Sequence, residues 1–284
     1  MSIVMWGSIS EPSRPSFLRS RLGAKLRHMR EKANLTLDEA AFLLDKTRSA
    51  LHHVETGETK PNVHLIRSMM DVYDCHDPVL VHEVRKALKR PWYQAHGLKS
   101  RYHVDVETAS ALACVFSPLV VPDPLQTKQY TVALLKHWNH PSPNDELTIR
   151  RIRQKRLTDR KRPLRLIAVM DEMVLRRTVG GLETMRKQLQ RLIDTAALRA
   201  VAVHILPTED QGPCVVAGAF TLLTLPESTD PDLLHVDHLA GPMDTEDPKK
   251  LPYARDVFEY PRSQALGEVE SIELIERTLA ETYG

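Results

Sequence analysis

The sequence predicts a two-domain protein, in which an all-α bundle of five short helices is followed by an α+β domain. Three observations lead to this fold class. The chain has 284 residues, more than a single domain commonly needs. Up to about residue 90, apolar residues recur with helical spacing between helix-capping residues. Beyond residue 105, strand-like apolar runs alternate with helical segments, which is typical of α+β domains.

The first two helices of the bundle follow from spacing and capping. Leu22, Leu26 and Met29 share one face of the first helix. The second helix begins after Thr36, because Glu39 stands three residues later and can complete a capping box.

The other three helices are expected at 47–55, from Pro61 onward, and from Asp77 to Arg90. Asp77 would cap the fifth helix, with Pro78 at its first position. The connections are only a few residues long, which predicts a compact bundle.

The α+β domain is expected to contain four strands and several helices. A helix, a proline-bounded loop and a second helix are predicted for 107–138, and the apolar run 111–116 is assigned to the first of these helices. The strands are expected at 164–170, 199–206, 215–225 and 233–240. Further helices are expected at 144–159, 182–197, 247–266 and 268–282.

Composition shifts give the domain boundaries. They predict a mobile N-terminal arm at 1–16, the helical bundle at 17–90, a linker at 91–104 and the α+β domain at 105–284.

Composition also excludes several classes of protein. Nothing approaches the ~18 apolar residues of a membrane span, and the first 17 residues lack the features of a signal peptide. The three cysteines, Cys75, Cys114 and Cys214, are odd in number and far apart, which argues against a disulfide framework. We therefore expect a cytoplasmic protein.

Charge is distributed unevenly along the chain. Residues 1–90 hold 15 Lys and Arg against 11 Asp and Glu, a net charge of +4, whereas the remainder has a net charge of −2. A basic N-terminal third is a mild indication of a polyanionic partner.

Residues 36–57 predict two helices joined by a sharp turn. Asp45 is placed at the turn because Asp tolerates the left-handed region that such a turn needs. Gly57 follows the second helix, where a left-handed residue is also favoured.

The second of these helices has two distinct faces. Its inward face would carry Thr47, Ala50, Leu51 and Val54. Its outward face would carry Arg48, Ser49, His52 and His53.

This arrangement resembles the phage-repressor-like (Cro/C1, XRE-type) helix-turn-helix family over roughly residues 20–75, a fold also called lambda-repressor-like. The residues that carry the resemblance are Leu26, Arg27, Arg30, Leu35, Thr36, Glu39, Ala41, Val54, Glu55, Gly57 and Pro61.

The resemblance implies that the second helix of the motif lies in the DNA major groove. Carried over by position, Arg48, Ser49 and His53 would contact base edges. Thr47 and Lys60 would contact the DNA backbone, and His52 would lie at the edge of the reading face. Arg30 and Glu55 would form a structural ion pair between two helices. Arg48 suits guanine, because its guanidinium can donate two hydrogen bonds to O6 and N7.

Two other interpretations of this helix remain. An ordinary solvated helix also carries polar residues. A metal site at His52 and His53 is disfavoured, because adjacent side chains on a helix diverge by about 100°. We expect no metal and no cofactor.

The region from about 105 to 284 resembles the C-terminal domain of WhiJ-like regulators, which are also classed as antitoxin-like. Asp123 departs from that pattern, which commonly has glycine at this position. The resemblance rests on 121–130, Arg151 to Gln154, 171–181, Met185, Gln188, Leu189, 204–207, Gly218, Phe220 and 265–271.

Three candidate sites stand out in the α+β domain. The first is a run of basic residues on the predicted helix at 144–159 and just after it. These residues could form a solvated helix face, or they could contact DNA flanks, an acidic partner or an anionic ligand. Asp171 and Glu172 resemble paired carboxylates, but acids at a helix start are favoured by its dipole. His235, Asp237 and His238 resemble metal ligands, but strand alternation places His238 on the opposite face. The basic run comprises Arg150, Arg151, Arg153, Lys155, Arg156, Arg160, Lys161, Arg162 and Arg165.

Three functional hypotheses follow. The first is a transcriptional regulator of development or secondary metabolism that binds an inverted repeat of double-stranded DNA as a homodimer and is nucleoid-associated. Its second domain would receive a signal from an unknown small-molecule ligand. The second is an antitoxin-like protein that binds a small partner protein encoded nearby and regulates its own operon. The third, an enzyme with a DNA-targeting domain, is disfavoured because the sequence shows no catalytic constellation.

Overall fold

The computed structural model describes residues 15–96, 102–138, 140, 142–208, 218–226, 232–238 and 242–283. Most of the expected N-terminal arm (1–14) and part of the expected linker (97–101) lie outside the described residues, as do 215–217 and 239–240 of two expected strands. Among the described helices, none is long and apolar enough to cross a membrane.

The chain forms two compact units that divide between Asp105 and Val106. The helical unit comes first and the α+β unit follows, so the predicted fold class is correct. Each unit is described separately below.

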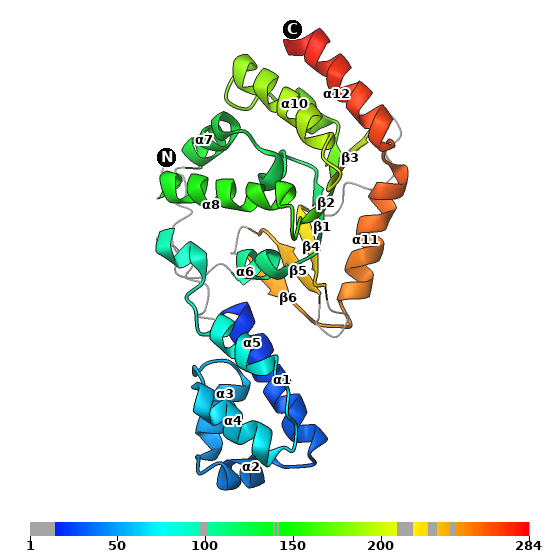
Figure 1. Cartoon of the computed structure of the whole chain (residues 1–284). Helices are drawn as coiled ribbons and strands as arrows, with labels where there is room; N and C mark the ends of the chain where they lie inside the picture. The colour runs from blue at the N-terminus through cyan, green and yellow to red at the C-terminus, as the bar shows by residue number, and fades with distance from the viewer. Residues whose placement is uncertain are drawn as a thin grey trace, which may run out of the picture. The chain divides into compact units, whose positions relative to one another are not determined.

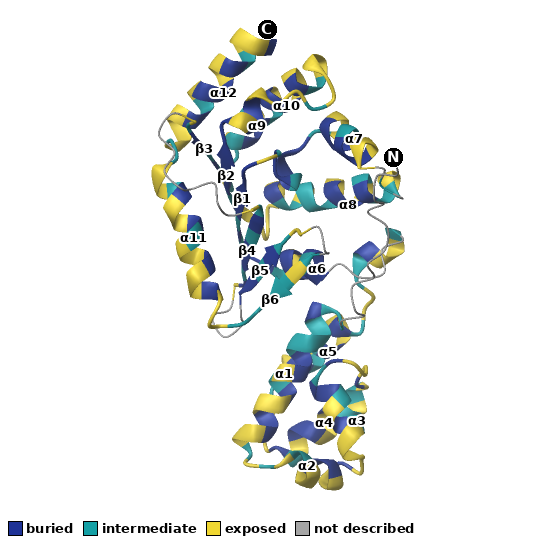
Figure 2. Cartoon of the chain, turned by 180° about the vertical axis from the view of Figure 1, so that it is seen from behind, coloured by how far each residue is buried: buried dark blue, intermediate teal, exposed yellow. Residues whose placement is uncertain are grey.

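Between residues 15 and 96, the helical unit has five described α-helices followed by a short 3₁₀ helix (Figure 1). They are α1 (Phe17–Lys32), α2 (Leu37–Leu43), α3 (Arg48–Glu55), α4 (Val63–Val72), α5 (Leu80–Ala87) and η1 (Trp92–His96). Their apolar faces meet in one core, in which Leu26, Leu51 and Ile66 are buried (Figure 2). Leu26 and Ile66 come from α1 and α4, so helices far apart in sequence share this core.

Local signals in the helix-turn-helix segment are confirmed. Thr36 and Glu39 form a complete capping box at the start of α2. Asp45 has φ 51° at the turn before α3, and Gly57 has φ 77° after it. Both residues therefore lie in the left-handed region that the sequence predicted for them.

The fifth helix begins later than predicted. Residues 78–79 form a turn, and α5 runs only from Leu80 to Ala87. Asp77 caps the turn before α5 and not the helix itself, because its Oδ1 accepts a hydrogen bond from the Val79 N–H and Val79 is the residue that precedes the helix. Its Oδ2 also binds Lys25 Nζ at 2.8 Å, which ties the turn to α1.

The second unit is built on a six-stranded mixed sheet with the order β3-β2-β1-β4-β5-β6. The strands are β1 (Leu112–Ser117), β2 (Arg165–Asp171), β3 (Val201–Leu206), β4 (Phe220–Thr224), β5 (Leu233–Val236) and β6 (Met243–Thr245). β1, β2 and β3 are parallel, whereas the pairs from β1 to β4 and onward to β6 are antiparallel.

Helices cover both faces of this sheet. α11 packs on one face, where Phe116, Phe220 and Phe258 form an apolar cluster. Figures 1 and 2 show α7 and α8 on the opposite face. The helices are α6 (Tyr102–Ala109), η2 (Asp123–Leu125), α7 (Lys128–His137), α8 (Pro143–Lys155), η3 (Arg156–Thr158), α9 (Met173–Arg176), α10 (Leu182–Ala196), α11 (Leu251–Gln264) and α12 (Glu268–Tyr283).

The assignment of the apolar run 111–116 to a helix is wrong, because Leu112–Ser117 is strand β1 in the interior of the sheet. Both faces of β1 are covered, so its residues are apolar without the alternation that marks a half-buried strand. β6 was not predicted either, since its three residues carry no apolar pattern.

The edge of β3 is closed by Leu266, just before α12, and by Ser271 in the first turn of that helix. The Leu266 N–H donates to the carbonyl of Ile205, and the Ile205 N–H donates to Ser271 Oγ. Because an open strand edge pairs readily with other chains, these bonds protect the sheet on this side.

We expect Gly23→Ala to destabilise the helical unit by about 1–3 kcal/mol, because a Cβ at residue 23 would lie 2.4 Å from the Glu55 carbonyl oxygen. On an open helix surface the same change would stabilise by up to about 1 kcal/mol. The sign of the change in the free energy of unfolding therefore distinguishes close packing from an open surface. Urea unfolding with hydrogen exchange at α1 and α3 measures the effect. Gly218→Ala is the control, because nothing lies within 4 Å of its added Cβ. A more stable Gly23→Ala variant would contradict this close packing of α1 and α3.

Candidate nucleic-acid interface and polar sites of the second unit

The candidate nucleic-acid interface is the outer face of α3. Thr47 caps this helix, and its Oγ1 accepts a hydrogen bond from the Ala50 N–H at 3.1 Å. Leu51 and Val54 point into the core of the unit. The opposite side of the helix therefore remains available for a partner.

Arg48, Ser49 and His52 are exposed on this outer face, as is Lys60 beyond the helix. The Arg48 Nε lies 3.4 Å from Asp38 Oδ1 of α2, and both side chains are about 70% exposed. An ion pair in this setting contributes little, so DNA can displace Asp38 at small cost.

His53 is half-buried and has an acidic neighbour that the sequence did not indicate. Its Nδ1 lies 2.6 Å from Glu58 Oε2 in the turn after α3. The His52 ring lies 5.9 Å from the His53 ring, at an interplanar angle of 57°. Only the Nε2 of His53 remains to contact DNA while Glu58 occupies Nδ1.

A buried ion pair anchors α3 to α1. Arg30 Nε donates to Glu55 Oε1 at 2.7 Å, and Nη2 donates to Oε2 at 2.9 Å. The third nitrogen, Nη1, donates to the Leu35 carbonyl at 2.8 Å. These hydrogen bonds to Glu55 raise the pKa of Arg30 above its ordinary value. The pair predicted from the sequence is thus a bidentate contact that sets the position of the candidate reading helix.

Tyr73 lies beside this pair. Its hydroxyl is buried and has no hydrogen-bond partner among the described residues. Burial, together with the nearby Glu55 carboxylate, raises the pKa of Tyr73 to about 12.

We expect Arg30→Met to destabilise the helical unit by about 3–5 kcal/mol, because it leaves Glu55 buried without its cation. The double change Arg30→Met with Glu55→Leu should recover much of this loss. Urea unfolding of both variants measures the difference.

Arg27→Met is the matched control, since Arg27 is on the same helix and its contact with Glu31 is exposed. It should cost under about 1 kcal/mol. An Arg30→Met variant as stable as this control would rule out the anchoring role.

In the second unit, the basic run is divided between an inner and an outer face. Arg150, Arg153 and Arg156 are turned inward, three residues apart on α8 and η3. Arg156 donates to the carbonyl of Glu107 in the last turn of α6 and to that of Ser110 just beyond it. Arg150, Arg153 and Arg156 therefore form neither a solvated helix face nor a surface that contacts DNA. The other cations are exposed: Arg151, Lys155, Arg160, Lys161, Arg162 and Arg165.

Arg150 and Arg153 hold the loop that follows β1. Arg150 Nη1 lies 2.6 Å from Asp123 Oδ1. Arg153 donates two hydrogen bonds to Glu107, at 2.8 and 2.6 Å, and a third to Asp123 at 3.2 Å. Burial opposes the charge of Arg153, but Glu107 and Asp123 outweigh it and raise the pKa of Arg153.

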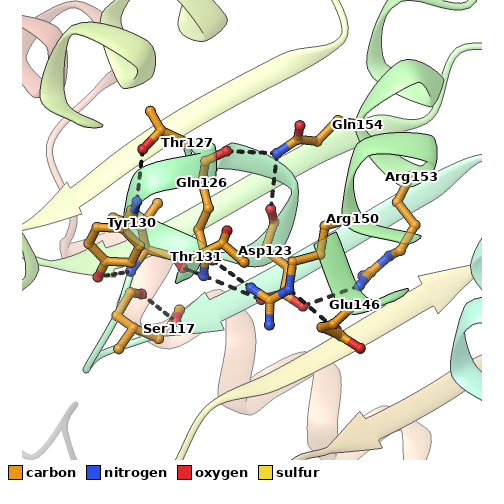
Figure 3. Close-up of polar contacts among 12 residues, drawn as sticks. Ser117, Asp123, Gln126, Thr127, Tyr130, Thr131, Glu146, Arg150, Arg153 and Gln154 are labelled. Atoms are coloured by element: carbon orange, nitrogen blue, oxygen red, sulfur yellow. Dashed lines mark hydrogen bonds and ion pairs between the residues drawn. The ribbon is translucent and has the colours of Figure 1, made fainter. Parts of the chain in front are cut away.

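Gln126 is the centre of the same network (Figure 3). Its amide nitrogen donates to the Val121 carbonyl at 2.7 Å, and its amide oxygen accepts from Thr131 and Arg150. Gln154 donates to the backbone carbonyl of Gln126 at 2.7 Å. The network fixes the backbone of the loop as well as its side chains.

The carboxylates of Asp171 and Glu172 have structural partners. Asp171 Oδ1 accepts from the Met173 N–H at 2.7 Å, at the start of α9. Glu172 pairs with Arg176 and accepts from the Thr208 N–H. The two acids therefore cap and brace a short helix.

His235 lies on β5 between two carboxylates. Its Nδ1 is 2.7 Å from Asp244 Oδ1, and its Nε2 is 3.3 Å from Asp237 Oδ1. Burial opposes protonation, but the two acids outweigh it and raise the pKa of His235 to about 9. Asp244 was missed, because β6 carries no pattern from which its position opposite His235 could be predicted.

The pKa of His235 predicts how the stability of the second unit depends on pH. Because the pKa of His235 is raised in the folded state, its protonation stabilises the fold fully below about pH 6.5. This stabilisation is lost as the pH rises through about 9. We expect a loss of roughly 3 kcal/mol over this interval. Thermal unfolding between pH 6 and 10 measures it. Asp244→Asn should flatten the dependence, whereas His137→Gln, an exposed histidine of α7, should leave it unchanged. An equally steep dependence in Asp244→Asn would contradict this assignment.

Comparisons with known proteins agree with the two units. Residues 100–277 match the family model described as a domain of unknown function (DUF5753), and residues 21–84 match a helix-turn-helix domain. The helix-turn-helix match supports DNA binding and transcription regulation. No curated protein matches the chain. The crystal structure of the clp gene regulator ClgR from C. glutamicum matches with 24% sequence identity and a TM-score of 0.23, covering 29% of this chain and 100% of that chain.

Proposed function

The chain belongs to the DUF5753 family, and from this together with its helix-turn-helix unit we propose that it is a sequence-specific transcriptional regulator of the XRE type. One observation carries the proposal. The polar face of α3 is exposed, while the opposite face and the Arg30–Glu55 pair fix the helix to its unit. A rigid helix with an open polar face is what major-groove reading requires.

In this proposal each residue of the outer face has a separate task. Arg48 donates two hydrogen bonds to a guanine, and Ser49 donates to or accepts from a neighbouring base. Lys60 neutralises a phosphate, and so positions the unit without reading sequence. Thr47 caps α3 through its oxygen, so its hydroxyl proton remains for a phosphate.

The contact with Glu58 defines what His53 can read. In a neutral ring whose Nδ1–H donates to Glu58, Nε2 is an acceptor. An acceptor fits the exocyclic amine of adenine or cytosine, not the O6 or N7 of guanine. His52 lies beside it and contacts the DNA backbone or a flanking base.

The second unit supplies dimerisation and a signal input, so that two copies bind an inverted repeat. This proposal includes a cytoplasmic location and control of development or secondary metabolism, as the likeness to WhiJ-like regulators implies. The polar clusters described above have structural partners, which favours a binding role over catalysis.

The alternative is an antitoxin-like protein whose main task is to bind a small partner protein. Affinity purification of the full chain from its own cells separates the two. A stoichiometric small protein that alters operator affinity would support the alternative, whereas a homodimer that binds its operator unaided would support the regulator.

We expect Arg48→Ala to weaken binding to the operator about ten- to hundredfold, and to relax base preference at one position, because it removes a base-edge contact. Lys60→Ala should weaken binding to operator and random DNA equally. In vitro selection with the wild-type chain defines the operator, and titrations at one salt concentration compare the variants. Equal losses on both DNAs for Arg48→Ala would remove Arg48 from the base readers.

A further inference from the structure

The second unit contains a pocket on the sheet face opposite α11. Its cavity volume is about 100 Å³. Val115, Thr221 and His235 contribute to its lining from three neighbouring strands, where each lies directly opposite the next in register. Val121 and Pro124, in the loop after β1, form a wall. Ala113, Val115 and Val121 add apolar surface beside these polar groups, and such a mixture is usual in a small-molecule site.

The polar groups around this pocket are rich in acceptors. Glu107, Asp123 and Asp237 bring three carboxylates to the lining. Each carboxylate can accept about four hydrogen bonds, so those paired with arginine retain acceptor capacity.

Several donors at the pocket are used within the protein. Both ring nitrogens of His235 lie against carboxylates. The Ser117 hydroxyl donates to the Val120 carbonyl at 2.7 Å. Arg150 and Arg153 are directed to acids, as described above. A ligand that is itself rich in donors is the complement of such a lining.

The net charge around the pocket also favours a cationic ligand. The lining residues and the side chains ion-paired with them hold three cations, with His235 counted as protonated, and four carboxylates. The cations are Arg150, Arg153 and His235, and the acids are Glu107, Asp123, Asp237 and Asp244. The resulting excess of negative charge attracts a cation.

The pocket is also preformed. Gln126 and Gln154 bind backbone carbonyls of the loop (Figure 3). Arg153 joins this loop to α6 through Asp123 and Glu107. The loop therefore loses little conformational entropy when a ligand enters, which favours binding of a small molecule.

We propose that this pocket binds a small organic cation through an ammonium or guanidinium group, with Asp237 and Asp123 as acceptors and the Val115–Thr221 base against its apolar part. The inference names the ligand class of the signal input and in that respect rests on the proposed function. Binding is measured without DNA, so a failure of ligand binding and a failure of operator recognition are distinguishable.

The test is a methyl-labelled NMR titration of the full chain, read at Ala113, Val115 and Val121, whose methyl groups line the pocket. The probes are butylamine, 1,4-diaminobutane and butylguanidine, with 1-butanol and butyrate as matched neutral and anionic compounds. We expect the three cations to shift these methyl signals, and the alcohol and the acid to leave them in place.

Asp237→Asn should weaken the binding of the cations about five- to tenfold, because it removes a charged acceptor from the rim. Asp256→Asn is the matched control, with the same change of charge on an exposed position of α11, and it should bind as the wild type does. Unfolding curves of both variants establish that they are folded.

Three results would overturn the proposal. They are equal shifts with 1-butanol, an unchanged affinity in Asp237→Asn, and shifts at these methyl groups with Mg²⁺ or Zn²⁺ but with none of the organic cations.

Discussion

The bidentate contact between Arg30 and Glu55 is the interaction on which the helix-turn-helix unit depends. Both side chains are buried, and either one alone would be an uncompensated charge that costs several kcal/mol. Because the guanidinium is planar and its third nitrogen binds Leu35, only one placement of α3 satisfies it. Gly23 then permits the backbones of α1 and α3 to touch. The second unit follows the same rule, since Arg153 is paired on two sides and thereby joins α6 to the loop after β1.

Local chemistry made the helical unit predictable. The capping box at Thr36 and the left-handed residues Asp45 and Gly57 depend on backbone requirements within a few residues, and these three features were identified from the sequence alone. The start of α5 was misplaced, because an Asp-Pro pair suits a turn as well as a helix start. β1 was assigned to the wrong class, since a strand buried on both faces shows no alternation and resembles a buried helix.

In the candidate sites too, features set by local sequence could be predicted, whereas contacts between distant residues could not. That Arg48 and His52 are exposed followed from helical periodicity, whereas the contacts of Asp38 with Arg48 and of Glu58 with His53 required the fold. In the second unit the basic run was visible, but its division into an inner and an outer face was not. Only the positions of Glu107 and Asp123, which are distant in sequence, decide which arginines turn inward.

The motif that carries the family resemblance and the proposed ligand pocket use largely different residues. Gln126 and Gln154 lie in the motif and bind backbone groups, so they maintain the shape of the unit. Thr221 and Asp237 lie outside it, on the pocket side of the sheet. Residues 121–124 belong to both, and among them Asp123, which stands where the pattern commonly has glycine, binds arginine through its carboxylate and lines the pocket. It needs none of the conformational freedom of glycine, since its φ is not positive. One side chain therefore both holds the loop to α8 and contributes a carboxylate to the pocket.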